Sequence, residues 1–236
     1  APERGPESMQ SDAIILEIAY TPEKETLFRE LVRRFNASQY RTLKGKPITV
    51  QATSLDAEAM VEAVLSGSFD AVSPDSSIWL EQFDIRWREQ EKLESSIVGE
   101  TFRYAVSPIV IAMWEDVARE MGYPEKAIGW EDILQRAASD SGFRWSHPST
   151  SSASGLLATL ATFYAGVNKT RGLTREDALA EKTLAYVSAV ERTVRYYGEG
   201  ELAVISRALT EGPGFLDAFV VQEQLVIYFN RQSQGP

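Results

Sequence analysis

A run of small hydroxyl residues near the middle of the chain is the part best suited to binding chemistry. Residues 143–157 read FRWSHPSTSSASGLL. This order predicts a strand that ends at Trp145, a break at His147-Pro148, and a helix whose first turn is rich in Ser and Thr. A helix N-terminus has N–H groups without intrahelical acceptors and a positive dipole end, and with hydroxyls around it can hold a small polar or anionic group. The hydroxyls expected to bind are Ser149, Thr150, Ser151 and Ser152.

The same residue types are good helix N-caps, so a purely structural role is the alternative for this segment. His147 is the single histidine, and there is no cysteine. These counts exclude disulfides, thiolate catalysis, cysteine-ligated metals and metal sites built from several histidines. They also disfavour a histidine-based triad. We expect no cofactor and no metal, and we expect His147 to support the hydroxyl segment from behind.

Carboxylates offer the remaining route to catalysis, because two of them can act as a general acid and a general base. The candidates are Asp56, Asp75, Glu211 and Glu223. The sequence contains no nucleophile elbow, phosphate-binding loop or zinc-protease motif beside them. The sequence therefore predicts a binding protein and not an enzyme.

Composition narrows the class of partner. The chain has 236 residues, of which 44% are hydrophobic and 25% charged, and this is ordinary for a globular protein. No apolar run is as long as a membrane span. The net charge of −10 argues against nucleic acid, whose binding proteins cluster Lys and Arg against phosphates. The polar, proline-containing segment 1–12 is typical of a linker.

Strands and helices alternate in the first part of the chain. Apolar runs predict strands at 13–19, 47–53 and 69–73, and helices follow at 23–38, at 56–65 and after Ser76. Three strand–helix units with short junctions predict a parallel sheet with right-handed crossovers. The fold class is therefore α/β.

The second part is predicted less regularly. Extended runs at 101–106 and 109–114, separated by Ser107-Pro108, resemble one long strand broken where the chain passes between lobes. Helices are expected at 115–121 and 130–138, and a long amphipathic helical region at 173–197. Thr174 with Asp177 predicts a capped start near the beginning of that region. Further strands are expected at 215–221 and 225–229.

Hydroxyls recur at the junctions of this pattern. In open α/β sheets, ligands bind outside the carboxyl ends of the strands, where helix N-termini meet. Each of the five junctions carries at least one hydroxyl, although Ser and Thr are favoured at caps in any case. The residues predicted to bind ligand are Tyr20, Thr21, Ser54, Asp75, Ser76, Ser77, Ser107, Ser149, Thr150, Ser151, Ser152 and Gln222.

Several longer motifs carry a resemblance to a known family. They are SPDSSIW at 73–79, SPIVIAMW at 107–114, IGW at 128–130, HPSTSSASGLL at 147–157, Glu191-Arg192 with Tyr197-Gly198, and Gly212-Pro213 with 218–223. Across about residues 13 to 230 the chain resembles a type 2 periplasmic or extracellular solute-binding protein. More narrowly, it is similar to the solute-binding module joined to a von Willebrand factor A domain in bacterial surface proteins.

The resemblance implies a two-lobed Venus-flytrap fold that holds a small polar or anionic solute in a cleft, for transport or sensing. Sulfate- and molybdate-type relatives hold oxyanions with hydroxyls and backbone N–H groups. The expected division is a linker at 1–12, lobe 1 at 13–106, lobe 2 at 107–228, and the start of a return to lobe 1 at 229–236. A membrane transporter or a von Willebrand factor A domain is the expected partner, and the expected location is extracytoplasmic and membrane-anchored.

The chain ends about where this family returns to its first lobe, so we expect a truncated chain with uncovered apolar side chains at 14–18 or 27–35. The sequence also departs from the family at Glu199-Gly200-Glu201, where an Asp-Ser-Thr-like step is usual. Two alternatives stay open. One is a surface interaction module that keeps the fold without a transport ligand. The other is a ferric site at Tyr196-Tyr197. Against it stands a structural role at the end of a helix, in which one tyrosine packs and the other is exposed.

Overall fold

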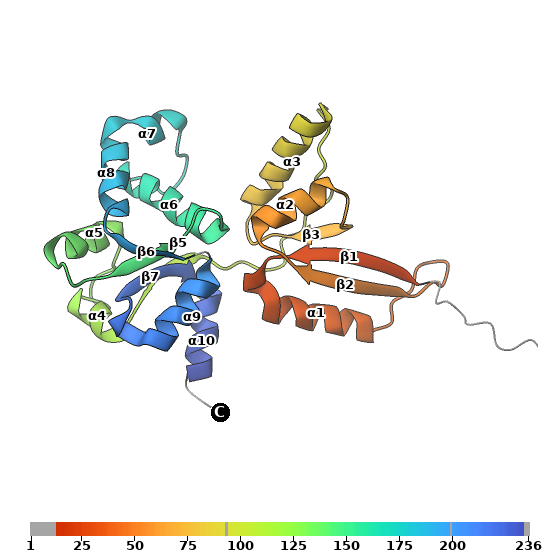
Figure 1. Cartoon of the computed structure of the whole chain (residues 1–236), viewed down its shortest axis with the longest axis horizontal. Coiled ribbons are helices and arrows are strands. Elements are labelled where there is room, and N and C mark those ends of the chain that lie inside the picture. The colour runs from red at the N-terminus through yellow and green to blue at the C-terminus, as the bar shows by residue number, and fades with distance from the viewer. Residues whose placement is uncertain (1–12, 93, 199, 234–236) are drawn as a thin grey trace, which may run out of the picture. The chain divides into compact units, whose positions relative to one another are not determined.

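The computed structural model describes residues 13–92, 94–198 and 200–233 (Figure 1). The chain forms two compact units, Ala1–Glu100 and Thr101–Pro236. Both units combine helices with a sheet, which confirms the α/β class. The linker expected at 1–12 lies outside the described residues. The lobe boundaries expected from the sequence stay a prediction.

Unit 1 contains a three-stranded parallel sheet of order β2-β1-β3. Its elements are β1 (Ile14–Tyr20), η1 (Pro22–Lys24), α1 (Glu25–Ala37), β2 (Ile48–Ser54), α2 (Ala57–Leu65), β3 (Ala71–Ser73) and α3 (Ser77–Glu91). Helix α1 lies on one face of the sheet, and α2 and α3 lie on the other (Figure 1). In the parallel register Tyr20 is opposite both Ser54 and Ser73, so the three strands end at one edge.

The apolar stripe of α1 packs only partly. Phe28 is buried and stacks on Tyr20 of β1, with ring centroids 4.6 Å apart. Leu27 and Leu31 stay 40% and 43% exposed, and Ile14 and Ile15 of β1 stay 38% and 48% exposed. These side chains lie in the two segments for which the sequence predicts uncovered apolar residues.

Unit 2 contains a four-stranded sheet of order β4-β7-β5-β6, in which only β4 is antiparallel to its neighbour. Its strands are β4 (Ile109–Met113), β5 (Trp145–Pro148), β6 (Val194–Gly198) and β7 (Ala218–Gln222). Its helices are α4 (Glu115–Glu120), α5 (Trp130–Ser139), α6 (Ala153–Gly166), α7 (Arg175–Leu179), α8 (Glu181–Glu191), α9 (Glu201–Glu211), η2 (Gly212–Gly214) and α10 (Glu223–Ser233).

Both faces of the unit 2 sheet are covered. Successive residues of a strand point to opposite faces. Phe219 and Val221 pack with residues of α9 and α10, whereas Ala218 and Val220 pack with residues of α5, α6 and α8. All five residues of β7 are buried. A strand buried on both faces reads as a continuous apolar run, as the sequence of β7 does.

Three sequence expectations in unit 2 are wrong. His147-Pro148 does not break the strand but completes β5. Pro148 is the last residue of the strand, so its missing N–H does not interrupt the hydrogen bonds between β5 and its neighbours. Residues 225–229 belong to α10, where Leu225, Val226 and Phe229 pack into one core. Residues 101–106 form no strand, and Phe102 and Val106 are 74% and 79% exposed.

The helical region expected at 173–197 is confirmed, as two helices, as far as Glu191, and it is wrong only at its end, where β6 begins at Val194. Its start is confirmed, because Thr174 and Asp177 form a reciprocal capping box at α7. Helix α8 ends near Glu191, and the Thr193 hydroxyl donates to the carbonyl of Val190 at 2.6 Å. The β-branched and aromatic residues that follow form β6 and pair with β5.

Candidate functional site

One edge of the unit 2 sheet collects the binding residues that the sequence predicts for this half. The carboxyl ends of β5, β6 and β7 meet there because these strands are parallel, and Pro148 lies opposite Gly198. Helices α6, α9 and α10 begin at this edge. Because β4 is antiparallel, it starts here, with Ile109 opposite Gln222. The structure therefore brings Ser107, Ser149, Thr150, Ser151, Ser152 and Gln222 to one edge.

Hydrogen bonds of Ser149 and Ser152 shape the loop between β5 and α6, and the two residues between them are exposed. Ser152 is the N-cap of α6, since its Oγ accepts from the N–H of Gly155 at 3.2 Å and donates to the carbonyl of Ser149 at 2.9 Å. Ser149 Oγ accepts from the N–H and the hydroxyl of Ser151, at 3.3 and 3.2 Å. Thr150 and Ser151 are exposed. The structural role therefore holds for Ser149 and Ser152, and hydroxyls are left over beyond what the cap needs.

Two glycines allow this loop to pack closely on its neighbours. A Cβ on Gly155 would lie 2.1 Å from the carbonyl oxygen of Ser149 and 2.3 Å from that of Pro148. A Cβ on Gly198 would lie 2.3 Å from Val204. The carbonyl of Gly198 accepts from the N–H of Ser149 at 2.8 Å. The backbone at 148–149 is thus held from both sides.

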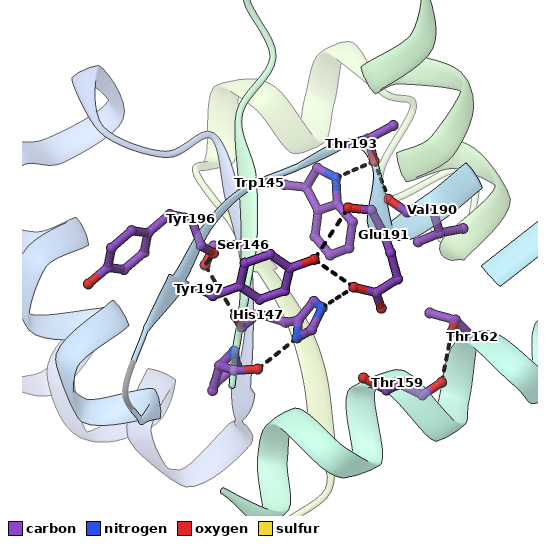
Figure 2. Close-up of polar contacts among 11 residues, drawn as sticks. Trp145, Ser146, His147, Thr159, Thr162, Val190, Glu191, Thr193, Tyr196 and Tyr197 are labelled. Carbon is purple, nitrogen blue, oxygen red and sulfur yellow. Dashed lines mark hydrogen bonds and ion pairs between the residues drawn. The ribbon is translucent and has the colours of Figure 1, made fainter. Parts of the chain in front are cut away.

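His147 is the third residue of β5, precedes the loop in sequence and is 2% exposed. Its polar contacts are shown in Figure 2. Its Nδ1 is 2.7 Å from the carbonyl oxygen of Pro148, and its Nε2 is 3.1 Å from Glu191 Oε2. Tyr197 donates its hydroxyl to the same carboxylate oxygen at 2.8 Å. Burial raises the pKa of Glu191, but the hydrogen bonds from His147 and Tyr197 outweigh it and bring the pKa below its ordinary value.

Tyr196 and Tyr197 do not form the pair that a ferric site would need. They are neighbours on β6 and point to opposite faces (Figure 2). Tyr196 packs on Phe215 and lies under the guanidinium of Arg207, whereas Tyr197 reaches Glu191. Across residues 13–92, 94–198 and 200–233 there is no group of three or more His, Asp or Glu residues that could hold a metal ion.

Glu201 at the start of α9 is a buried carboxyl group, noted from the sequence only as part of a departure from the family and not as a functional residue. It has no exposed surface, and its Oε2 accepts from the N–H of Gln222 at 2.8 Å. Gln222 is itself buried, and its Oε1 accepts from the side chain of Gln224 at 3.0 Å. Ser107 Oγ accepts from the N–H of Gln224 at 3.0 Å. The sequence signal that could have identified Glu201 is its position just after Gly200, in the first turn of a helix, where an acidic residue is favourable.

The predicted residues of unit 1 also gather at the carboxyl edge of their sheet, but they differ in exposure. Tyr20 is buried, and its hydroxyl donates to Glu25 at 2.5 Å. Thr21 is 1% exposed. Ser76 caps α3 by accepting from the N–H of Ile78 at 3.3 Å. Ser54 and Ser77 are exposed.

Three charged residues, Glu23, Lys24 and Asp75, lie near one another at the same edge, and only Asp75 is among the predicted binding residues. Lys24 Nζ donates to the carbonyl and hydroxyl of Ser73, at 3.0 and 2.9 Å, and to the carbonyl of Pro74 at 2.5 Å. Burial raises the pKa of Glu23 to about 7, and the charge of Asp75 adds to the rise. Burial also raises the pKa of Asp75 and lowers that of Lys24 to about 8.

Unit 1 should become less stable as the pH rises from about 5 to 7. A carboxyl whose pKa is higher in the native state binds more protons there than in the unfolded chain, so stability falls as Glu23 ionises. The loss is at most about 3 kcal/mol, at about 1.4 kcal/mol per pH unit. Glu23→Gln should remove this part of the pH dependence in urea unfolding at pH 5 and pH 8. Glu58→Gln, at an exposed position, is the control. If the free energy of unfolding of Glu23→Gln still changed between pH 5 and pH 8 as in the wild type, Glu23 would not be the group responsible.

Within unit 2, the two carboxylates considered for catalysis lie apart. Asp56 is exposed at the start of α2 in unit 1, and Glu211 and Glu223 belong to unit 2. Glu211 ends α9 and pairs with Arg207 at 2.5 Å. Helices α9 and α10 both begin at the carboxyl edge of the unit 2 sheet. Glu223 is the first residue of α10, whereas Glu211 is the last residue of α9, and a helix rises about 1.5 Å per residue. Glu211 therefore lies far from the edge at which Glu223 lies.

Comparison with known proteins identifies the family. A family model described as bacterial extracellular solute-binding protein matches residues 16–234. No curated protein matches the chain.

Solved structures show the same fold at low sequence identity. The sulfate-binding protein SubI from Mycobacterium tuberculosis H37Rv is 14% identical, with a TM-score of 0.61 over 93% of this chain and 68% of that one. The tungstate-binding protein TupA from Desulfovibrio alaskensis G20 is 14% identical, with a TM-score of 0.51 over 95% and 73%. The substrate-binding protein Lmo0181 from Listeria monocytogenes, in complex with cycloalternan, is 11% identical, with a TM-score of 0.52 over 89% and 62%.

Proposed function

The chain belongs to the family of bacterial extracellular solute-binding proteins, and on that basis we propose that it captures a small polar or anionic solute for transport or sensing. The observation that carries the proposal is the loop 149–152. It presents the exposed residues Thr150 and Ser151 beside the first turn of α6. Membership of this family implies a location outside the cytoplasm. No described helix combines the length and apolar character needed to cross a bilayer.

The chemistry of the loop favours a ligand that accepts hydrogen bonds. Residues 149–154 carry no charged side chain. The N–H groups of Ala153 and Ser154 belong to the first turn of a 14-residue helix, where intrahelical acceptors are missing. Such a helix end favours negative charge. Sulfate and tungstate, named for two structures of this fold, accept hydrogen bonds and carry negative charge. A saccharide is the neutral counterpart to test.

The hydroxyls of unit 1, and the cleft between lobes that the family resemblance implies, stay predictions for this chain. We also infer, as the family resemblance implies, a membrane transporter or a von Willebrand factor A domain as partner, and anchoring at the membrane. Copurification of the full-length protein from membranes, with partners identified by mass spectrometry, tests these points.

Replacing Ser151 by alanine should weaken solute binding. A lost hydrogen bond to a charged group costs about 1.5–3 kcal/mol, which is roughly 10- to 150-fold in Kd, and one to a neutral group about 0.5–1.5 kcal/mol. Native mass spectrometry of the purified protein should first identify any solute carried through. Calorimetric titration with sodium sulfate, sodium tungstate and cycloalternan then compares the wild type with Ser151→Ala.

Ser206→Ala is the matched control, because Ser206 is exposed on α9 away from the loop. Equal affinity of the wild type and Ser151→Ala for a solute that binds would remove the loop from the site. Failure of the wild type to bind any of the three, with nothing carried through purification, would favour the interaction-module alternative.

A further inference from the structure

A hydrogen-bonded turn at residues 41–46, here called the basic turn, carries a fully exposed leucine at its tip. The N–H of Thr42 donates to the carbonyl of Lys46, and the N–H of Gly45 donates to the carbonyl of Thr42, both at 2.9 Å. Gly45 has a φ of +81°, which suits the last position of a three-residue hairpin loop. Leu43 is 108% exposed. The geometry of the turn explains Gly45 but not Leu43, because turns favour polar residues, glycine and proline.

The base of the basic turn is fixed to the rest of unit 1. The ring of Tyr40 packs on Phe35 of α1, with centroids 5.0 Å apart. The carbonyl of Tyr40 accepts from the N–H of Ile48, the first residue of β2, at 2.9 Å. A turn that is already ordered presents Leu43 to a partner without the entropy cost of ordering a flexible loop.

The charged side chains of the basic turn are all positive. Arg41 and Lys44 are exposed, and Lys46 is half-buried. Arg41 donates to a backbone carbonyl of the turn at 2.8 Å, which holds its guanidinium beside the tip. Residues 26–55 contain six basic side chains and one acidic side chain, although the whole chain has a net charge of −10. Salt screens exposed charges beyond about 10 Å, so a partner at this surface meets the local positive charge.

The basic turn links the end of α1 to the start of β2, at the end of unit 1 where β1 begins (Figure 1). The N–H of Ile14 in β1 donates to the carbonyl of Pro47 at 2.8 Å. Tyr20 and Ser54 end their strands at the opposite edge of this sheet. A strand of 7 residues is about 23 Å long. A partner at the basic turn therefore leaves the predicted binding residues of unit 1 uncovered.

A single apolar side chain among cations fits an anionic lipid surface better than it fits a protein. Protein interfaces have an apolar core in which aromatic residues are enriched and Lys is depleted. Anionic lipid headgroups attract Lys and Arg, and apolar side chains enter the boundary between headgroups and acyl chains. Each such residue contributes little by itself, so this contact is weak, reversible and sensitive to salt.

We propose that the basic turn binds anionic lipid surfaces, with Leu43 entering the headgroup region and with Arg41 and Lys44 binding lipid phosphates. This contact places the start of β1 beside the lipid surface and the carboxyl edge of the unit 1 sheet away from it. The proposal goes beyond solute capture and does not depend on it, because the basic turn contains none of the predicted binding residues.

Cosedimentation of the full chain with lipid vesicles tests the proposal. The wild type should sediment with vesicles made of equal parts phosphatidylglycerol and phosphatidylcholine at low salt, and high salt should release it. Vesicles of phosphatidylcholine alone should bind it far less. Lys44→Gln should lower the partition coefficient roughly fivefold, because it removes one charge from the lipid contact. Leu43→Ser should lower it at least as much, because the inserted apolar side chain is lost.

Leu179→Ser and Lys182→Gln are the matched controls, since both residues are exposed in unit 2, and they should leave vesicle binding unchanged. A wild type that stays in solution with phosphatidylglycerol vesicles at low salt would overturn the proposal and leave the basic turn to an acidic protein partner. Binding that Leu43→Ser and Lys44→Gln do not reduce would overturn it as well, because another surface would then be responsible. Equal binding to phosphatidylcholine vesicles would contradict the role of headgroup charge.

Discussion

Replacing Gly155 by alanine is expected to distort loop 149–152 and to lower the free energy of unfolding by about 3 kcal/mol, the upper range for overpacking. The added Cβ would lie 2.1 Å from one backbone oxygen and 2.3 Å from another. Neither oxygen can withdraw freely, since the carbonyl of Pro148 accepts from His147 and Ser149 donates its N–H to Gly198. Urea unfolding and solute titration measure the two effects.

The loss of stability in Gly155→Ala would be the opposite of the usual effect of this substitution inside a helix. Alanine in place of glycine inside a helix gains about 1 kcal/mol where space allows. Gly214→Ala is the control in the same unit, because a Cβ there would have no atom within 4 Å. Wild-type stability in Gly155→Ala would show that the loop backbone yields easily and is not held as described.

Truncating Trp145 should have the largest effect on stability, about 3–5 kcal/mol for Trp145→Ala. Trp145 is 1% exposed, packs edge-on against Trp130 at 5.8 Å between centroids, and donates its Nε1–H to Thr193 at 2.8 Å. It also begins β5, the strand that leads into loop 149–152. Its loss should therefore reduce both the urea midpoint and the affinity for solute.

Trp145→Phe separates packing from hydrogen bonding in that result. Phenylalanine keeps most of the buried ring, and the Thr193 hydroxyl still donates to Val190. The expected cost is about 1–2 kcal/mol, from the smaller volume and the lost bond. An equal loss in the alanine and phenylalanine variants would mean that the hydrogen bond, and not the packing, holds this end of β5.

Short-range chemistry made much of the fold predictable. The strand–helix alternation of unit 1 follows from apolar runs bounded by turn residues. The starts of α3, α6 and α7 follow from Ser76, Ser152 and Thr174, whose hydroxyls cap within three residues of themselves. These interactions are complete within a few residues of chain, so residue type and spacing carry the information. The hydroxyl loop was predictable for the same reason.

Elements whose type depends on a distant partner were not predictable. Residues 194–198 form a strand because β5 offers them a parallel ladder, and 225–229 form a helix because one face packs into a core shared with α9. A short apolar run satisfies a strand period and a helix period equally well. Only the tertiary contacts decide between them.

The contrast between short-range and long-range interactions also applies to the predicted binding residues and to the charged groups near them. Ser149 to Ser152 are visible in the sequence as one run, and His147 as its neighbour. Glu191 meets His147 across 44 residues, and Lys24 meets Ser73 across 49. The pKa of Glu23 rises because folding withdraws its carboxyl from water. The sequence by itself determined which groups are available for binding. Only the folded chain creates burial and long-range contacts, and these decide which groups carry charge and which hold the loop in place.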